Sequence, residues 1–331
     1  MTAVDGFDLE NKRVWVAGHT GMVGSAIVRR LEEEPISEIV TATSSDVDLR
    51  RQADAEEFVL RSRPDVAIIS AAVVGGINAN RTAQGRFLYE NLMIAANSIE
   101  ACRLAGIDKV VVLGSSCIYP KDTAQPIDED QLLTGRLEPS NEGYAVAKIA
   151  ALEMGKMYRR QYGLDVISLM PTNLYGTGDN YDLATSHVLP ALLRKIHEAK
   201  VSETSQVEIW GSGRPRREFL HVDDMADATV FATCHYSGER HLNVGTGEEV
   251  SIADLATMIA DIVGWSGTFS FNTSMPDGTM LKRLDVSRLE SLGWSHSIGL
   301  REGIERTYED YLLEDAVFSA TVTTTHGRSR S

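Results

Sequence analysis

The stretch Arg13–Gly24, RVWVAGHTGMVG, decides the fold. Its first half is an apolar, β-branched run that predicts a buried strand, and its second half holds glycines in a GxxGxxG pattern that opens a helix. Glycines allow the backbone to turn sharply and approach a pyrophosphate, whose charge is met by amide groups at the positive end of the helix. A tight turn kept for packing alone would show similar glycines. The position after the first strand of an alternating chain favours dinucleotide binding.

Outward from this turn, strand-like and helix-like patterns alternate. Strands are predicted at 38–43, 65–72, 109–114 and 165–170, and helices at 22–34, 53–63, 86–105 and 144–162. This alternation predicts βαβ units, hence an α/β fold with a Rossmann-type doubly wound parallel sheet and helices on both faces. We assign residues 1–172 mainly to this dinucleotide-binding domain.

The regular alternation of strands and helices ends after Thr172, where the predicted loops become longer and contain clusters of Gly and Pro such as GSGRPRRE. We expect 173–317 to form mainly a smaller C-terminal substrate lobe, with some return to the sheet. The polar segment 318–331 lacks periodicity, which predicts a disordered tail.

The net charge of -15 disfavours nucleic acid and anionic membranes as partners. The longest apolar runs are too short to span a bilayer, so we expect a cytoplasmic protein. The three cysteines are too few and too scattered for a metal cage, and we expect no metal. An anionic ligand would need a local basic patch, and Arg214, Arg216 and Arg217 form the densest one.

Tyr144 and Lys148 lie one helical turn apart on one predicted face. A lysine cation near a phenol favours phenolate and lowers its pKa, so that Tyr144 could pass a proton to a carbonyl oxygen as hydride reaches the carbon. Ser115 and Ser116 end a predicted strand, where a hydroxyl could stabilise an oxyanion. An incidental helical pair and a polar strand cap are the alternative interpretations. The consistent order of glycine turn, serines and Tyr-Lys pair favours the catalytic one.

With these motifs the sequence resembles the extended short-chain dehydrogenase/reductase family and, within it, the GDP-L-fucose synthases. These are epimerase-reductases of GDP-4-keto-6-deoxy-D-mannose that form GDP-L-fucose. The resemblance covers nearly the whole chain to about residue 313. Its most specific segments are LGSSCIYPK (113–121), SHVLPALLRK (186–195) and WGSGRPRREFLHVDDMA (210–226).

The resemblance implies roles for individual residues. The residues implied for the reduction are Ser115, Tyr144 and Lys148, and those implied for C3/C5 epimerisation are Cys117 and His187. Without the resemblance, Cys117 would be interpreted as a small buried hydrophobic residue and His187 as a cap at the start of a helix. The implied cofactor contacts are Gly18, Thr20, Gly21, Met22, Val23, Gly24, Ser44, Leu113, Ser116, Lys148, Pro171, Asn173, Leu174 and His187. The implied substrate contacts are Lys195, Trp210, Arg217, Asp277 and Lys282. A GDP-sugar substrate and a homodimer are also implied.

NADP(H) is the expected cofactor, and NAD(H) is possible. Relatives that prefer NADPH carry Arg within the glycine turn and after the second strand, where this chain has Thr20, Ala42 and Ser44. NAD-binding relatives carry an acidic residue at the end of the second strand. This chain has none there, because Asp46 lies a few residues beyond the strand. Position 195 holds Lys where relatives commonly have Arg, which keeps the charge and loses the bidentate fork.

Other functions remain open at this point. A nucleotide-sugar 4-epimerase or dehydratase with bound NAD(P) would need the Tyr-Lys pair and would have no use for Cys117 and His187. A GDP-heptose epimerase-reductase would use the same residues on another sugar. A non-catalytic cofactor-binding module is disfavoured because Tyr144 and Lys148 are both present.

Overall fold

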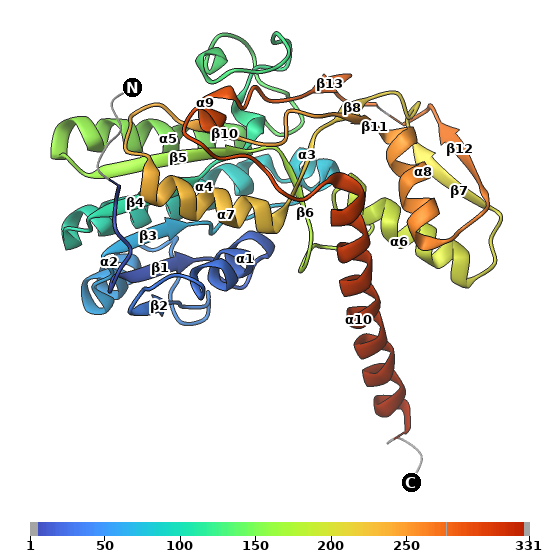
Figure 1. The fold of residues 1–331 in the computed structure, drawn as a ribbon, viewed down its shortest axis with the longest axis horizontal. Coiled ribbons are helices and arrows are strands. Elements are labelled where there is room, and N and C mark those ends of the chain that lie inside the picture. Colours follow the sequence, from blue (N-terminus) through green and yellow to red (C-terminus); the bar gives the residue numbers. More distant parts are fainter. Residues whose placement is uncertain (1–5, 276, 328–331) are drawn as a thin grey trace.

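The computed structural model describes residues 6–275 and 277–327, with 77, 78 and 314–327 described as backbone alone. Its centre is a six-stranded parallel sheet with strand order β10-β5-β4-β3-β1-β2 (Figure 1). The strands are β1 (Arg13–Ala17), β2 (Glu38–Val40), β3 (Val66–Ile69), β4 (Lys109–Leu113), β5 (Asp165–Pro171) and β10 (Leu242–Val244). The order reverses between β1 and β3, and ligands of such sheets bind beyond the strand ends at that point.

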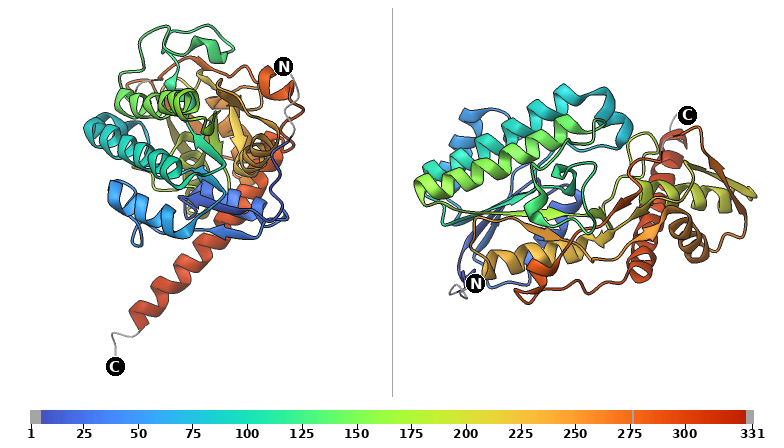
Figure 2. Two further views of the ribbon diagram at one scale, coloured as in Figure 1. Left: turned by 90° about the vertical axis from the view of Figure 1, so that its left-hand side faces the viewer. Right: turned by 90° about the horizontal axis from the view of Figure 1, so that it is seen from above.

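Helices cover both faces of the sheet because successive side chains of each strand point to opposite faces. Val14 and Val16 of β1 pack in one core with α1 (Met22–Leu31) and α7 (Val222–His235). Trp15 and Ala17 pack in the other with three helices, which are stacked on one side of the sheet in the left view of Figure 2. These are α2 (Gln52–Ser62), α4 (Gln84–Ala105) and α5 (Glu142–Tyr162). The predicted strands and helices of this half are confirmed, and the doubly wound fold with them.

A smaller lobe follows, with its own core around α6 (Val188–Val201) and α8 (Ile252–Val263). Its short sheets pair β7 (Gln206–Trp210) with β12 (Thr268–Asn272), and β8 (Arg216–Arg217) with both β11 (Val250–Ser251) and β13 (Leu281–Lys282). The strands β6 (Asn173–Tyr175) and β9 (Phe219–His221) pair in parallel. From β9 the chain returns to the large sheet through α7 and β10. The remaining short helices are α3 (Ile77–Thr82), η1 (Ser116–Ile118), η2 (Glu129–Gln131) and α9 (Ser287–Glu290).

The last helix, α10 (Leu300–Gly327), begins in the core of the small lobe through Ile304 and Tyr311. Its backbone stays helical over 318–327, where the sequence predicts a disordered tail, and 328–331 lie outside the described residues. Once the first turns are fixed by packing, each further helical residue adds one hydrogen bond. Within the described residues, no helix combines the length and apolar character needed to cross a membrane.

Candidate active site

The glycine turn is shaped to receive a ligand by its backbone. Gly18 has φ of +83°, and a Cβ there would lie 2.7 Å from the Cα of Ala71, just after β3. A Cβ on Gly24 would lie 2.0 Å from the carbonyl oxygen of Gly18. Gly21 caps α1 without a side-chain hydrogen bond, and the first turn of α1 contains no acidic residue. The amides at this helix end therefore remain available to an anion, and the turn fits the pyrophosphate of a dinucleotide.

The loop after β2 is polar and lacks Lys and Arg over 41–46. Asp46 accepts hydrogen bonds from the amide (2.9 Å) and the hydroxyl (2.6 Å) of Thr43, which hold the pKa of its carboxyl below the usual value. His19 of the glycine turn acts on Asp46 in the same direction. Ser44 is exposed beside this pair. The loop therefore carries hydroxyl groups, and residues 41–46 contain no Lys or Arg that could bind a phosphate.

The turn at the end of β4 brings the predicted reduction residues together. The Ser115 Oγ accepts a hydrogen bond from the Cys117 amide at 3.3 Å, which leaves the hydroxyl hydrogen free for another acceptor. Lys148 donates to the Leu113 carbonyl oxygen at 2.8 Å, and its Nζ lies 5.6 Å from the centroid of the Tyr144 ring. The Tyr-Lys pair of α5 therefore lies against the strand end that carries the serines.

The electrostatics of this pair differ from the expectation that Lys148 lowers the pKa of Tyr144. Burial raises the pKa of the Tyr144 phenol, with a smaller contribution from Cys117. Burial also lowers the pKa of Lys148 to about 8. Burial disfavours the charged form of each group, the phenolate of Tyr144 and the ammonium of Lys148. Tyr144 is consequently a protonated phenol at neutral pH, the form that a proton donor needs.

Cys117 links this turn to the predicted substrate residues. Burial raises the pKa of its thiol, while the Lys282 ammonium, the Ser115 hydroxyl and Lys148 act in the opposite direction. Lys282 and Arg217 are register partners on β13 and β8, so the two cations lie side by side. Burial lowers the pKa of both. Two adjacent, desolvated cations in an acidic protein favour an anionic ligand such as a diphosphate.

The other predicted substrate residues extend the same surface. Asp277 accepts from the amide (2.6 Å) and the hydroxyl (2.8 Å) of Ser212, and Arg217 contributes to its lowered pKa. Lys195 lies with its Nζ 5.4 Å from the Trp210 ring centroid, and Trp210 is 57% exposed. An exposed indole beside a cation is suited to stack on a planar base.

His187 is the N-cap residue of α6 without a side-chain cap bond. It is exposed, yet neighbouring groups desolvate the ring enough to lower its pKa. The Gly76 amide donates to the Thr185 carbonyl oxygen at 2.8 Å, and a Cβ on Gly75 would lie 3.3 Å from the Phe87 ring, which meets Tyr144 edge-on. His187 is thereby tied to the region of Tyr144. No described hydrogen bond joins His187 to Cys117, and their pairing stays a prediction.

The remaining predicted cofactor residues occupy β5, β6, the glycine turn and the first turn of α1. Pro171 ends β5, and Leu174 of β6 packs against the large core. The Asn173 side chain donates to the Glu218 carbonyl oxygen at 2.7 Å, so one of its amide hydrogens is already used. Met22 and Val23 pack against the same core, and Thr20 is exposed.

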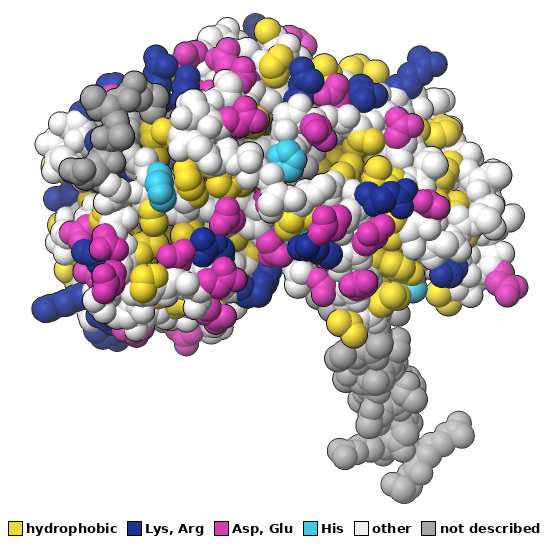
Figure 3. Space-filling model, viewed as in Figure 1, with side chains coloured by type: hydrophobic (Ala, Val, Ile, Leu, Met, Phe, Trp, Pro, Cys, Tyr) yellow, Lys and Arg dark blue, Asp and Glu magenta, His cyan; other side chains and the backbone are white. Residues whose placement is uncertain are grey.

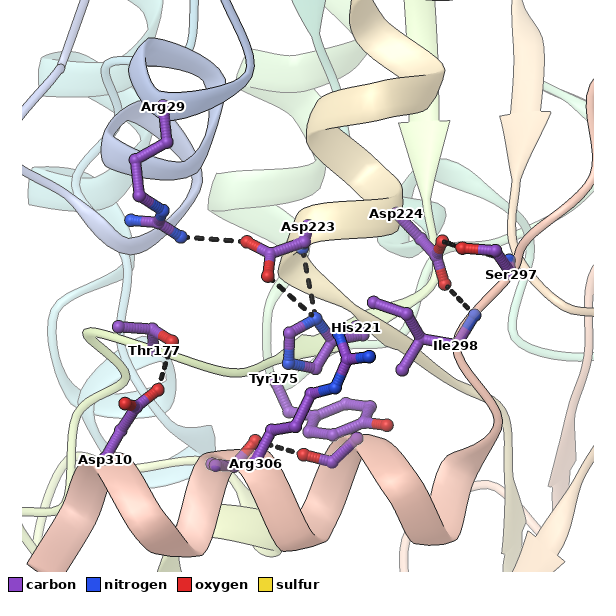
Figure 4. A network of polar contacts seen from close by, with 12 residues as sticks. Arg29, Tyr175, Thr177, His221, Asp223, Asp224, Ser297, Ile298, Arg306 and Asp310 are labelled. Atoms are coloured by element: carbon purple, nitrogen blue, oxygen red, sulfur yellow. Dashed lines mark hydrogen bonds and ion pairs between the residues drawn. The ribbon is translucent and has the colours of Figure 1, made fainter. Parts of the chain in front are cut away.

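Sequence reasoning missed several residues inside REFLHVDDMA. Glu218 is fully buried, and its carboxylate accepts from the amides of Thr246 (2.6 Å), Gly247 (2.9 Å) and Leu284 (2.7 Å). Asp224 accepts from the amides of Ser297 and Ile298, both at 3.0 Å (Figure 4). The signal was the density of charged residues in an otherwise apolar segment.

The same region contains an ion pair between two helices of the large sheet. Arg29 of α1 lies 2.8 Å from Asp223 of α7, and Asp223 also contacts His221 (Figure 4). The Nδ1 of His221 accepts from the Asp223 amide at 3.2 Å, and its ring packs edge-on against Tyr175. These contacts fix the start of α7 against α1 and against the paired strands β6 and β9.

The surface has no dominant basic face in the view of Figure 3, where acidic and basic side chains are interspersed. Within the described part of the chain, no group of three or more His, Cys, Asp or Glu side chains could hold a metal ion. The candidate site is made of the glycine turn, the Ser115–Cys117 turn, the Tyr-Lys pair and the Arg217–Lys282 pair.

Comparison with known proteins identifies the family of the chain. The profile of the NAD dependent epimerase/dehydratase family matches residues 14–245. The GDP-L-fucose synthase of Sinorhizobium fredii (strain NBRC 101917 / NGR234) is 50% identical over 304 residues, 92% of this chain and 96% of that protein. A GDP-6-OMe-4-keto-L-xylo-heptose reductase from C. jejuni is 36% identical, with a TM-score of 0.88 and coverage of 93% of this chain and 99% of that one.

An NADP-bound GDP-L-fucose synthetase from Naegleria fowleri is 27% identical, with a TM-score of 0.87 and coverage of 94% of this chain and 98% of that one. The chain belongs to the NAD dependent epimerase/dehydratase family, in the branch that contains the GDP-L-fucose synthases.

Proposed function

We propose that the protein is a bifunctional epimerase-reductase that converts GDP-4-keto-6-deoxy-D-mannose to GDP-L-fucose with NADPH. The observation that carries the proposal is the position of Cys117, a buried thiol within the electrostatic reach of both Lys148 and Lys282. A simple 4-epimerase or dehydratase has no use for a titratable thiol at this place. The 50% identity to the S. fredii enzyme supports the same activity, and the 36% identity to the heptose reductase makes a heptose substrate the weaker choice.

The cation pair sets the substrate in place. The diphosphate lies against Arg217 and Lys282, and the Asp277 carboxylate accepts a hydrogen bond from a hydroxyl of the ribose or sugar. The guanine base stacks on the exposed indole of Trp210, next to Lys195. Ser115 then donates its hydroxyl hydrogen to the C4 carbonyl oxygen. Its Oγ can at the same time accept the hydrogen bond from the Cys117 amide.

Epimerisation needs an acid and a base on opposite faces of the sugar. Protons on C3 and C5 are acidic because the C4 ketone stabilises the enolate that their loss creates. Cys117 and His187 supply the pair, one removing a proton and the other returning one to the opposite face. The cations Lys282 and Lys148 favour the thiolate form of Cys117 against burial.

Reduction follows at C4. A bound reduced nicotinamide supplies the hydride. Tyr144, held protonated by burial, gives its proton to the C4 oxygen as the alkoxide develops, and Lys148 stabilises the phenolate that remains. The glycine turn and α1 would hold the pyrophosphate, and the Ser44 hydroxyl would face the 2′-phosphate of NADPH.

Two matched variants test this assignment with GDP-4-keto-6-deoxy-D-mannose in D₂O, followed by NMR. Cys117→Ser is expected to lose deuterium incorporation at C3 and C5, whereas Tyr144→Phe keeps incorporation and loses reduction by about 10²- to 10⁴-fold. GDP-L-fucose is the expected product of the unmodified protein. Deuterium incorporation that survives Cys117→Ser would reject Cys117 as an epimerisation residue, and an unmodified protein that incorporates no deuterium at C3 and C5 would favour the 4-epimerase alternative.

The protein is further proposed to act in the cytoplasm as a homodimer. Apolar side chains are exposed on α4 and α5, which pack side by side, and these are Tyr89, Leu104, Val146, Met157 and Tyr162. Pairing of the two helices with those of a second copy would cover them. Light scattering of the purified protein measures the molecular mass that decides this point.

A further inference from the structure

A buried polar cluster centred on Asn243 lies behind the turn that carries Cys117. Asn243 is fully buried on β10. Its side-chain amide donates to two main-chain carbonyl oxygens, those of Ile127 (2.9 Å) and Asp285 (3.0 Å). Its backbone amide donates to the Glu129 carboxylate at 3.0 Å. Both amide hydrogens of the side chain are used, so the orientation of the Asn243 side chain is fixed.

The remaining polar atom of Asn243 holds Tyr119. Tyr119 is buried, with 3% of the residue exposed, and its hydroxyl donates to Asn243 Oδ1 at 2.5 Å and lies 3.0 Å from His241 Nε2. A hydroxyl has one hydrogen, so its bond to Asn243 assigns the Nε2 proton to His241, which donates to the phenol oxygen. Burial lowers the pKa of His241, which keeps the ring neutral in this role.

These bonds connect two catalytic segments. Tyr119 closes the η1 turn two positions after Cys117. Asp285 follows Lys282 by three positions, and its segment is held again by Ile127, which donates to Arg283 O and accepts from the Asp285 amide, both at 2.8 Å. One buried amide therefore reaches the Cys117 turn through Tyr119 and the Lys282 segment through the Asp285 carbonyl.

We infer that Tyr119 is a positioning residue: its hydroxyl, held by Asn243 and His241, sets where the Cys117 thiol lies relative to the Lys282 ammonium. Only its consequence for epimerisation depends on the function proposed above. A thiol and an ammonium interact more weakly as their separation grows, so a loosened turn would weaken the influence of Lys282 on Cys117. Displacement of a reacting group by about 1 Å can cost on the order of 100-fold in rate.

A double-mutant cycle on cysteine reactivity tests the positioning without any sugar. The rate of Cys117 alkylation by iodoacetamide is measured against pH, with Cys117→Ser as the background for Cys102 and Cys234. Lys282→Met is expected to move the midpoint of Cys117 to higher pH because a favourable cation is lost. In the Tyr119→Phe protein the same Lys282→Met shift is expected to fall to about half or less, since coupled residues are not additive. An equal shift in both backgrounds overturns the inference.

Tyr236→Phe is the matched control, because the Tyr236 hydroxyl is also buried and donates to the Arg240 carbonyl oxygen at 2.6 Å. It is expected to lower the melting temperature about as much as Tyr119→Phe and to leave the Lys282→Met shift unchanged. With the ketosugar, Tyr119→Phe is expected to slow C3/C5 deuterium exchange about tenfold with KM unchanged. If the unmodified protein exchanged no deuterium, the proposed function would fail, and the alkylation cycle would still decide the role of Tyr119.

Discussion

At the scale of single residues, burial controls the chemistry of the candidate site. Tyr144 keeps its proton because a phenolate is poorly solvated inside the protein, and Lys148 is close to losing one for the same reason. The sequence correctly placed the pair on one helix face. It could not show how strongly residues from other elements would desolvate the two groups.

The lowered pKa of Lys148 predicts a pH dependence. The ammonium is present below pH of about 8 and is lost as the pH rises through that value, so kcat/KM for reduction is expected to fall above about pH 8. Lys148→Met should reduce the substrate slowly and should not show the decrease in kcat/KM above about pH 8. Steady-state rates between neutral pH and the alkaline range measure it, and a wild-type profile that stays flat across that range would contradict the assignment.

The same shift has a consequence for stability. Because the folded pKa of Lys148 lies below that of the unfolded chain, the unfolded state binds more protons between about pH 8 and 10.5. The contribution of Lys148 to the free energy of unfolding therefore rises with pH across this window. The difference between wild type and Lys148→Met in urea titrations isolates it, because the other groups are common to both.

Cofactor preference is also decided by single residues. Ser44→Arg would place a cation in the loop that is proposed to face the 2′-phosphate. It is expected to raise the ratio of kcat/KM for NADPH over NADH about tenfold or more, since hydrogen bonds to charged groups contribute about 1.5–3 kcal/mol. Ser45→Arg is the neighbouring exposed control. A ratio unchanged by Ser44→Arg would show that this loop does not meet the 2′-phosphate.

At the scale of elements, the junction of β1 and α1 depends on the absence of a side chain. Gly24→Ala would push a Cβ to 2.0 Å from the Gly18 carbonyl oxygen, and the turn would have to shift. The expected cost is roughly 1–3 kcal/mol of stability, with weaker cofactor binding. Gly85→Ala in α4 is the control, because a Cβ there meets nothing within 4 Å and should be neutral or stabilising by up to about 1 kcal/mol. Urea unfolding and NADPH fluorescence titration distinguish the two; equal behaviour would contradict the structure of the turn.

At the scale of the whole molecule, the junction of the lobes rests on a buried carboxylate. Asp224→Ala would leave the buried amide of Ile298 and that of Ser297 without their acceptor, at an expected cost of about 3 kcal/mol. Asp223→Ala removes an exposed ion pair with Arg29 and a longer contact, 3.6 Å, with the His221 ring, and should cost about 0.5 kcal/mol. Urea unfolding compares them. Similar losses in both variants would show that Asp224 does not hold the lobes together.

The sequence by itself determined the parallel sheet, the glycine turn and the position of the Tyr-Lys pair. These follow from local physics, namely the period of apolar residues and the backbone freedom of glycine, which act over a few neighbouring positions. The bounds of the elements agree within a few residues for this reason. The family resemblance added roles for Cys117, His187 and the substrate residues, whose pairing across the site is still a prediction.

Only the tertiary structure decided which distant residues meet. The register of β8 with β13 places Arg217 beside Lys282, and the fold brings Lys282 within reach of Cys117. Glu218, Asp224 and Asn243 showed no role in the sequence because each acts by accepting or donating hydrogen bonds across segments far apart in the chain. Burial is likewise a property of the assembled molecule, and so the protonation of Tyr144 and Lys148 could be known only once the lobes were packed.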